Sequence, residues 1–312
     1  MTIGIAAMGP RSGAGILAGL RAVEAVGRGA IGGFVSLVVL TADQKLMRAE
    51  TQNGGTRGLF TTSPPEEILR APYAALISSG PNRPSPLSQF IAAAPGIGIV
   101  TGHRFPHVST EQGHALNELV LDAMRNGVAA QDAIDELIAA HPGFDAGFVA
   151  LSTRGEVGLG NMPAVHRLLD QGAAINHCTD TGASVATLHN AIQPSKAIAV
   201  LASEVVLDEI RRCDTKVQTI TVVAGIELSF GDEPEIHINE KFMATRVAHP
   251  QAHTLNAETS FGMGDRVKVV QFGQSIGWLG QEPYMVVKRG VIATLEGKLE
   301  IQLSVLLGDA AR

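Results

Sequence analysis

The spacing of apolar and polar positions in the first half of the chain switches between that of strands and that of helices. Residues 2–8 form an apolar run, which predicts a buried strand. Residues 12–26 carry apolar side chains at helical spacing, behind a Ser12 cap and before Gly27, which predicts a helix. Residues 33–52 hold two apolar segments around a short polar turn, and they predict an antiparallel hairpin.

The same kind of pattern continues to residue 161. It predicts two further strands, a pair of helices and a second hairpin, at 73–80, 96–102, 111–126, 129–141 and 145–161 in turn. Strands, then helices, then strands again are typical of a layered fold with helices on the faces of sheets. We therefore predict an α+β sandwich for this part of the chain.

The second half of the chain has a weaker pattern. Residues 164–180 show no clear periodicity, and residues 184–212 predict a helix that is interrupted at Pro194. From residue 217 onward the pattern predicts short strands, with a loop-rich segment at 231–265.

This change of pattern divides the chain near residue 170. Residues 1–170 form the predicted core, and residues 171–312 form a helix followed by a β-rich region. The second part either completes the same fold or forms an interface, and the pattern leaves both interpretations open.

Composition narrows the classes of partner. The 312 residues carry a net charge of −6, and aromatic residues make up 4% of them. Nucleic-acid binding needs cationic surface and stacking platforms, so we expect no nucleic-acid partner. No apolar run reaches the length of a membrane helix and the start lacks signal-peptide features, which predicts a cytoplasmic protein without membrane contact. A charged fraction of 17% is compatible with a homo-oligomer.

Cysteines and histidines show no metal motif. Cys178 and Cys213 form no CxxC pair, and two cysteines in a long chain predict buried thiols in a reducing compartment. Two histidine pairs have a spacing of four residues, His103 with His107 and His249 with His253. A proline interrupts each pair, so we expect isolated surface histidines, no metal and no cofactor.

Residues 13–18, Gly-Ala-Gly-Ile-Leu-Ala, match the GxGxxA form of a dinucleotide-binding loop. The context differs from that motif, because an antiparallel hairpin follows and Asp43 lies beyond the usual spacing of about 20 residues. Nucleotide binding through Gly13 and Gly15 is kept as a third hypothesis.

Thr2 opens the first predicted strand. Removal of Met1 would leave Thr2 with a hydroxyl and a free α-amine on one residue. That amine has an ordinary pKa of about 7.7–8.0, so its neutral fraction at pH 7 can act as the base for the hydroxyl. The alternative is that Thr2 is simply a β-branched residue at the start of a strand.

Residues 1–163 resemble the N-terminal nucleophile (Ntn) hydrolases, including uncharacterised bacterial proteins of that fold. The likeness is carried by "MTIGIAA", the hairpin at 33–52, the strands and helix pair that follow, and "DAGFVALSTRGEVGLGN". The resemblance implies a four-layer αββα sandwich, Thr2 as nucleophile with its α-amine as base, and cleavage of an amide bond. The chain departs from the family in its early helix and in the position of Lys45 in a turn, so proteasome-like proteolysis is not implied.

Three loops are candidates for the rest of such a site. If the strands at 73–80 and 96–102 are parallel neighbours, their ends bring together the candidate substrate-binding residues Ser79, Asn82, Arg83, His103 and Arg104. The arginines would suit an anionic group, and solvated arginines at a capped turn are the alternative. Candidate oxyanion donors, or an ordinary glycine turn, are Asn53, Gly54 and Gly55. His189 and Asn190 either line a pocket or form a buried hydrogen-bonded pair.

The leading hypothesis is therefore a hydrolase of a non-ring amide bond in a small molecule, for which an anionic group is an option. The other hypotheses are a non-catalytic small-molecule-binding or structural protein of the same fold, and a nucleotide-binding enzyme. Substitution of Thr2 separates the first hypothesis from the other two.

Overall fold

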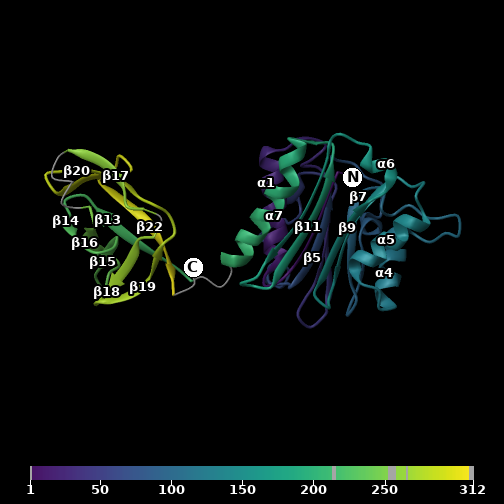
Figure 1. Cartoon of the computed structure of the whole chain (residues 1–312), viewed down its shortest axis with the longest axis horizontal. Helices are drawn as coiled ribbons and strands as arrows, with labels where there is room; N and C mark the ends of the chain where they lie inside the picture. The colour runs from purple at the N-terminus through teal and green to yellow at the C-terminus, as the bar shows by residue number, and fades with distance from the viewer. Residues whose placement is uncertain (1, 213–215, 252–257, 265, 309–312) are drawn as a thin grey trace. The chain divides into compact units, whose positions relative to one another are not determined.

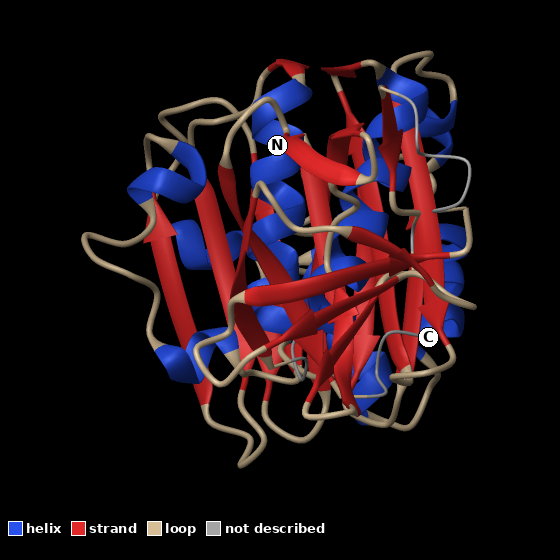
Figure 2. Ribbon diagram, turned by 90° about the vertical axis from the view of Figure 1, so that its left-hand side faces the viewer, coloured by secondary structure: helices blue, strands red, loops and turns tan. Residues whose placement is uncertain are grey.

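The computed structural model describes residues 2–212, 216–251, 258–264 and 266–308. The chain divides into two compact units, Met1–Cys213 and Asp214–Arg312, and each unit has its own hydrophobic core. Strands are the main regular structure of both units (Figure 2). In the described part of the chain, no helix is both long enough and apolar enough to cross a membrane.

The boundary between the units lies after Cys213 and not near residue 170. The residues that follow 170 belong to the first unit because they form two strands of its larger sheet and a helix packed on that sheet. Residues 171–212 therefore continue the fold of the first unit.

The larger sheet of the first unit is entirely antiparallel, and β1 lies near its centre. Its six strands, in spatial order, are β10 (Gln171–Cys178), β11 (Ala183–Asn190), β1 (Ile3–Met8), β5 (Tyr73–Ser78), β3 (Val35–Leu40) and β4 (Leu46–Thr51). The hairpin predicted at 33–52 is confirmed as β3 and β4.

A second antiparallel sheet packs against one face of the first. It contains β6 (Ala92–Ala94), β7 (Gly98–Arg104), β8 (Ala146–Ser152) and β9 (Glu156–Asn161). The outer face of the larger sheet carries α1 (Ser12–Val26) and α7 (Ser195–Arg212), and the outer face of the smaller sheet carries α4 (Leu116–Arg125) and α5 (Ala130–Ala140). Figure 1 shows the resulting order of layers: helices, sheet, sheet, helices.

Short elements connect these layers. They are β2 (Arg28–Gly29) paired with β12 (Ile192–Gln193), α2 (Gly55–Gly58), α3 (Glu66–Leu69), a 3-10 turn at Leu87–Phe90, and α6 (Pro163–His166).

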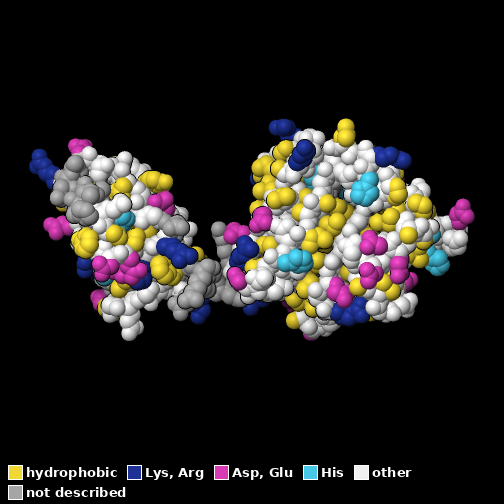
Figure 3. Space-filling model, in the orientation of Figure 1, with side chains coloured by type: hydrophobic (Ala, Val, Ile, Leu, Met, Phe, Trp, Pro, Cys, Tyr) yellow, Lys and Arg dark blue, Asp and Glu magenta, His cyan; other side chains and the backbone are white. Residues whose placement is uncertain are grey.

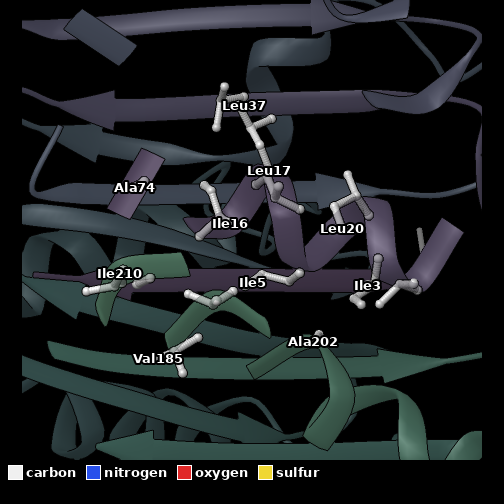
Figure 4. Close-up of a cluster of buried hydrophobic side chains, with 14 of the residues drawn as sticks. Ile3, Ile5, Ile16, Leu17, Leu20, Leu37, Ala74, Val185, Ala202 and Ile210 are labelled. Carbon is white, nitrogen blue, oxygen red and sulfur yellow. The ribbon is translucent and has the colours of Figure 1, made fainter. Parts of the chain in front are cut away.

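Strand β1 shows how the sequence builds two cores on one sheet. Ile3, Ile5 and Ala7 alternate along the strand and pack with the helices α1 and α7, as Figure 4 shows for Ile3 and Ile5. Ala6 points to the opposite face and joins the core between the two sheets. All four residues are fully buried, because both faces of a central strand are covered.

The two sheets approach one another closely at the start of β1. A Cβ atom on Gly4 would lie 2.4 Å from the carbonyl oxygen of Gly102, and Thr101 Oγ1 donates to the Leu76 carbonyl across the gap at 3.0 Å. Strands β5 and β7 are therefore neighbours in packing but belong to different sheets. They are not parallel neighbours in one sheet, so the condition under which their ends would bring the candidate substrate-binding residues together is not met.

Two stretches of the first unit differ from their predicted structure. Residues 171–178, without clear periodicity, form the edge strand β10, and residues 183–190 form β11 and not the start of a helix. Every residue of β11 is buried, so its sequence lacks the alternation that marks a half-exposed strand. The helix itself begins at Ser195, directly after Pro194.

The second unit is built almost entirely of strands. A mixed seven-stranded sheet has the order β13 (Val217–Val223), β22 (Glu300–Leu307), β19 (Gln274–Leu279), β18 (Lys268–Gln271), β15 (Glu235–Ile238), β16 (Ala244–His249) and β14 (Leu228–Phe230). A three-stranded sheet contains β17 (Thr259–Gly262), β20 (Tyr284–Lys288) and β21 (Val291–Leu295). The predicted β-rich region is confirmed, and the predicted loop-rich segment 231–265 contains three of these strands.

Candidate functional site

Thr2 lies at the entrance to β1 and is 5% exposed. Its Oγ1 donates to the carbonyl oxygen of Ala30 at 2.6 Å and lies 3.2 Å from that of Ser78. Its backbone N–H donates to the Ser78 carbonyl at 3.0 Å, and its own carbonyl accepts from the Asn190 N–H at 2.8 Å. We call Thr2, Ala30, Ser78 and Asn190 the Thr2 corner.

The loop after β5 folds back beside this corner. Ser79 is fully buried, and its Oγ accepts a hydrogen bond from the Arg83 guanidinium at 2.7 Å. Gln52 holds the backbone of Arg83 with two hydrogen bonds of 2.8 Å. A Cβ atom on Gly80 would lie 3.5 Å from Arg83 Nη2 and 3.8 Å from Ala30 Cβ, so Arg83 lies close to the loop that contacts Thr2.

The candidate oxyanion loop is engaged in packing. The Gly55 N–H donates to the Gly33 carbonyl at 2.8 Å, and Asn53 is exposed. The Glu24 carboxylate accepts hydrogen bonds from the N–H and Oγ1 of Thr56, which fixes the loop against α1. Gly54, in a left-handed conformation, precedes α2. The glycine-turn interpretation therefore accounts for this segment, since the Gly55 donor is already used.

A chain of side-chain amides and one buried imidazole leads away from the Thr2 corner. His103 is fully buried, with Nδ1 3.0 Å from Asn190 Oδ1 and Nε2 2.7 Å from Asn161 Oδ1. Asn161 Nδ2 in turn donates to Gln171 Oε1 at 2.8 Å, and Gln171 Nε2 donates to the His166 carbonyl at 3.1 Å. We call His103, Asn161, Gln171 and Asn190 the amide chain.

Burial lowers the pKa of His103, so its ring is neutral near pH 7. A neutral imidazole has one donor. The Asn161 oxygen fixes that donor on Nε2, because the amide nitrogen of Asn161 is already paired with Gln171. Nδ1 is then an acceptor, so it forms a hydrogen bond with Asn190 only when that carboxamide is turned to present Nδ2, in place of Oδ1, to the ring. His103 is therefore a buried link in this hydrogen-bonded chain, and the prediction of an isolated surface histidine is wrong at this position.

The remaining candidate residues do not converge on Thr2. Arg104 forms a two-pronged ion pair with Asp145, and the Asp145 hydrogen bond raises the pKa of the guanidinium. Asn82 is exposed in a left-handed conformation with φ 60°. Of the two arginines, Arg83 is thus the one placed beside the Ala30 loop.

His189 lies on the face of β11 opposite to the amide chain. Its Nε2 is 2.8 Å from the Ser195 carbonyl, and its buried Nδ1 has no hydrogen-bond partner among the described residues. Burial lowers the pKa of His189 to about 4, so the ring is neutral at pH 7. Its neighbour Asn190 belongs to the Thr2 corner, so the side chains of His189 and Asn190 lie on opposite faces of β11.

A cavity of about 600 Å³ opens between the edge strands β9 and β10. Asn161 and Gln171 lie in its wall with apolar side chains of β9, β11 and α5, and α6 contributes His166. A second cavity, of about 590 Å³, lies beside Glu24, Thr56 and Arg57. Thr2 lines neither of these two cavities.

The glycines of the possible nucleotide loop have a packing role. The Gly13 N–H donates to the Ala71 carbonyl at 3.2 Å, and a Cβ on Gly13 would lie 1.8 Å from the Ile68 carbonyl oxygen. A Cβ on Gly15 would lie 3.1 Å from Val206 of α7. Protein atoms therefore occupy the space that a pyrophosphate would need at this helix start.

The described residues contain no cluster of side chains that could hold a metal ion. No group of three or more His, Cys, Asp or Glu side chains among them converges on one point, and His253 and Cys213 lie outside the described residues. Cys178 is a buried free thiol, as expected. Lys and Arg side chains are interspersed with Asp and Glu on the face drawn in Figure 3.

Asn161, Gln171 and the Ala30 carbonyl were not anticipated from the sequence. Each meets the other residues of the candidate site only through pairing across distant segments, and a single asparagine at the end of the 145–161 hairpin gives no local signal of this. The Ala30 contact depends on the backbone alone, so no residue type could have indicated it.

The first unit thus defines a four-layer α+β sandwich with a buried threonine at the entrance to a central strand, and the second unit is a β-rich module. Residues 2–219 match the family described as "Domain of unknown function (DUF6963)", and the chain belongs to this family. Residues 225–300 match a further family, "Domain of unknown function (DUF7259)".

No curated protein matches the chain. Among solved structures, the chain is similar to a glutamine phosphoribosylpyrophosphate (PRPP) amidotransferase from B. subtilis complexed with ADP and GMP. The identity is 13% and the TM-score 0.38, over 65% of this chain and 43% of the amidotransferase chain. The chain therefore matches less than half of the length of that protein.

Proposed function

We propose that the first unit is an Ntn-hydrolase-like amidase that cleaves an amide bond in a small molecule, with Thr2 as the nucleophile. The observation that carries the proposal is the position of Thr2 in the layered fold. It lies at the entrance to a central strand of the larger sheet, close to the facing sheet. Its Oγ1 is 2.6 Å from the Ala30 carbonyl oxygen, and its nitrogen is 3.0 Å from the Ser78 carbonyl oxygen. The Ntn resemblance implies a nucleophile at the start of the first strand, and Thr2 lies there.

The chemistry requires cleavage of the peptide bond between Met1 and Thr2. The α-amine so formed takes the proton of the Thr2 hydroxyl, and Oγ1 attacks the carbonyl carbon of the amide. The amine then returns the proton to the leaving nitrogen, and water hydrolyses the ester that remains on Thr2. The Ser78 carbonyl, 3.0 Å from the Thr2 nitrogen, orients the amine. Arg83 is the residue that we propose to meet an anionic group of the substrate.

The test has a chemical step and a kinetic step. Periodate splits a free N-terminal threonine between the carbons that carry the amine and the hydroxyl, and releases acetaldehyde. We expect protein from the natural host to lack residue 1 and to react with periodate. We expect Thr2→Ala to be inert to periodate and at least about 10³-fold slower on any amide that the wild type hydrolyses.

Thr2→Ser is the matched control, since it keeps the amine and a hydroxyl. It should react with periodate and retain measurable hydrolysis. An intact Met1–Thr2 bond in protein from the natural host, or full activity in Thr2→Ala, would overturn the proposal.

A second candidate function is small-molecule binding without catalysis. The observation that favours it is the cavity of about 600 Å³ between β9 and β10, which Thr2 does not line. Binding that persists in Thr2→Ala, with no hydrolysis in the wild type, is the expected outcome for this function.

A further inference from the structure

We infer that the cavity between β9 and β10 binds a small neutral or cationic compound that has an apolar body and an amide group. The inference rests on the cavity alone and holds whether or not Thr2 is a nucleophile. Three features of the cavity support it: the direction of the backbone groups at its two edges, the chemistry of its walls, and the charge at its rim.

The register of each sheet directs backbone hydrogen-bonding groups toward the cavity. Leu159 of β9 lies opposite Val149 of β8. The backbone N–H and C=O of Leu159 bond to the Gln131 side chain, which shows that they point away from β8. The same groups of Asn161, two residues on, share that direction. On β10, the Ala191 N–H bonds to the Asp170 carbonyl, so the backbone groups of Ala173 point away from β11.

The Gln131 side chain shows what such an edge binds. Its carboxamide accepts from the Leu159 N–H at 3.0 Å and donates to the Leu159 carbonyl at 3.1 Å. An amide thus pairs with the backbone of β9 at Leu159, which itself lines the cavity, with the two bonds that a neighbouring strand would make. A ligand amide at Asn161 would repeat this contact at the next outward-facing position.

The walls and the rim specify the rest of the ligand. Ile138, Leu159 and Leu188 supply apolar surface. The amide chain holds the Asn161 and Gln171 side chains in place, because each is bonded on both sides. Asp135 stands at the rim, and the described lining residues include neither lysine nor arginine, so a ligand carboxylate is disfavoured there. A volume of about 600 Å³ suits a compound of amino-acid to drug size.

Two probes of the same shape test the inference. N-acetyl-L-leucinamide has an apolar body and a neutral amide, and N-acetyl-L-leucine replaces the terminal amide by a carboxylate. We expect the amide to shift the methyl resonances of Ile138, Leu159 and Leu188 in a saturable titration of the full chain. The carboxylate should bind at least about tenfold more weakly.

Two variants show where the probe binds. Ala173 is exposed on β10 and lines the cavity, so Ala173→Phe should fill the cavity and weaken the amide at least about tenfold without burying the new ring in the core. Leu169 is 99% exposed and does not line the cavity, so Leu169→Phe is the control and should bind as the wild type does. The inference is overturned if the methyl resonances do not move, if Ala173→Phe binds equally well, or if the carboxylate binds as tightly as the amide.

Discussion

The Thr2 corner and the β9–β10 cavity are linked by the amide chain but are built from different groups. Backbone carbonyls of Ala30 and Ser78 hold Thr2, so the fold of the two sheets sets its geometry. Side-chain amides of Asn161 and Gln171 form the polar wall of the cavity. The corner should therefore respond to changes in sheet packing, and the cavity to the removal of single side chains.

The difference has a consequence for mutational tests. A substitution that leaves backbone paths unchanged will barely move the carbonyls around Thr2, even when it lies nearby. A substitution in the amide chain leaves a buried polar group without its partner, which costs about 1–3 kcal/mol at each such group. The two regions can thus be perturbed separately.

Gly4→Ala should have the largest effect. The added methyl would lie 2.4 Å from the Gly102 carbonyl oxygen, which belongs to the backbone of the facing sheet and cannot move alone. We expect the first unit to lose about 3 kcal/mol of stability or more, or to fail to fold. The measurement is the free energy of unfolding from hydrogen exchange of β1 peptides across a urea series.

Gly143→Ala is the matched control for that experiment. No heavy atom lies within 4 Å of the added methyl, and Gly143 does not require a left-handed conformation. Its stability should stay within about 0.5 kcal/mol of the wild type. Equal stability of Gly4→Ala and Gly143→Ala would show that the sheets are not in close contact at the start of β1.

Lowering the pH should have the next largest effect on stability, because two buried histidines are neutral in the folded protein. Burial lowers the pKa of His189 from its ordinary 6.5 to about 4, so the unfolded chain binds a proton that the folded chain excludes. The stability contributed by this residue is present above pH 6.5 and falls as the pH drops toward 4. Between pH 7 and pH 5 the loss is about 2 kcal/mol.

His189→Gln removes this titration and isolates its contribution. The variant should lose less stability than the wild type between pH 7 and pH 5, measured by hydrogen exchange of β11 peptides. The pKa of His103 is also lowered by burial, so part of the acid sensitivity should remain in the variant. An identical pH slope in both proteins would contradict a neutral buried His189.

Much of the fold of the first unit could be predicted because its elements carry local signals. Apolar runs locate β1 and the β3–β4 hairpin, and helical spacing locates α1. Strand β11 could not be found in this way, because both of its faces are buried and its apolar run resembles a buried helix. The boundary near 170 was wrong for two reasons: the segment that forms β10 shows no clear periodicity, and β11 was taken for the start of a helix.

The site was less predictable than the fold. Thr2 was identified from its chemistry, and Ser79 and Arg83 from a rigid turn, and these three do lie near one another. The two arginines were expected to converge, but Arg104 pairs with Asp145. Side-chain pairing across segments as distant as Asn161 and His103 depends on tertiary packing, which a single sequence does not display.

The smallest expected effect comes from Gln131→Ala, at the edge of the cavity. The substitution removes both hydrogen bonds between Gln131 and Leu159, and water can then bind the backbone N–H and C=O of Leu159. The cost in stability should therefore be about 1 kcal/mol or less. The sharper readout is the Leu159 amide itself, whose hydrogen exchange should become faster. Glu136→Ala is the control, because Glu136 is exposed on the same helix α5.

This last comparison decides how the cavity recognises a ligand. If Leu159 exchanges faster only in Gln131→Ala, then a carboxamide is what satisfies the outward-facing edge of β9. The equivalent edge at Asn161 is then suited to the amide of a ligand. If the exchange rate of Leu159 is unchanged, another group protects this edge, and the preference of the cavity for amides loses its main support.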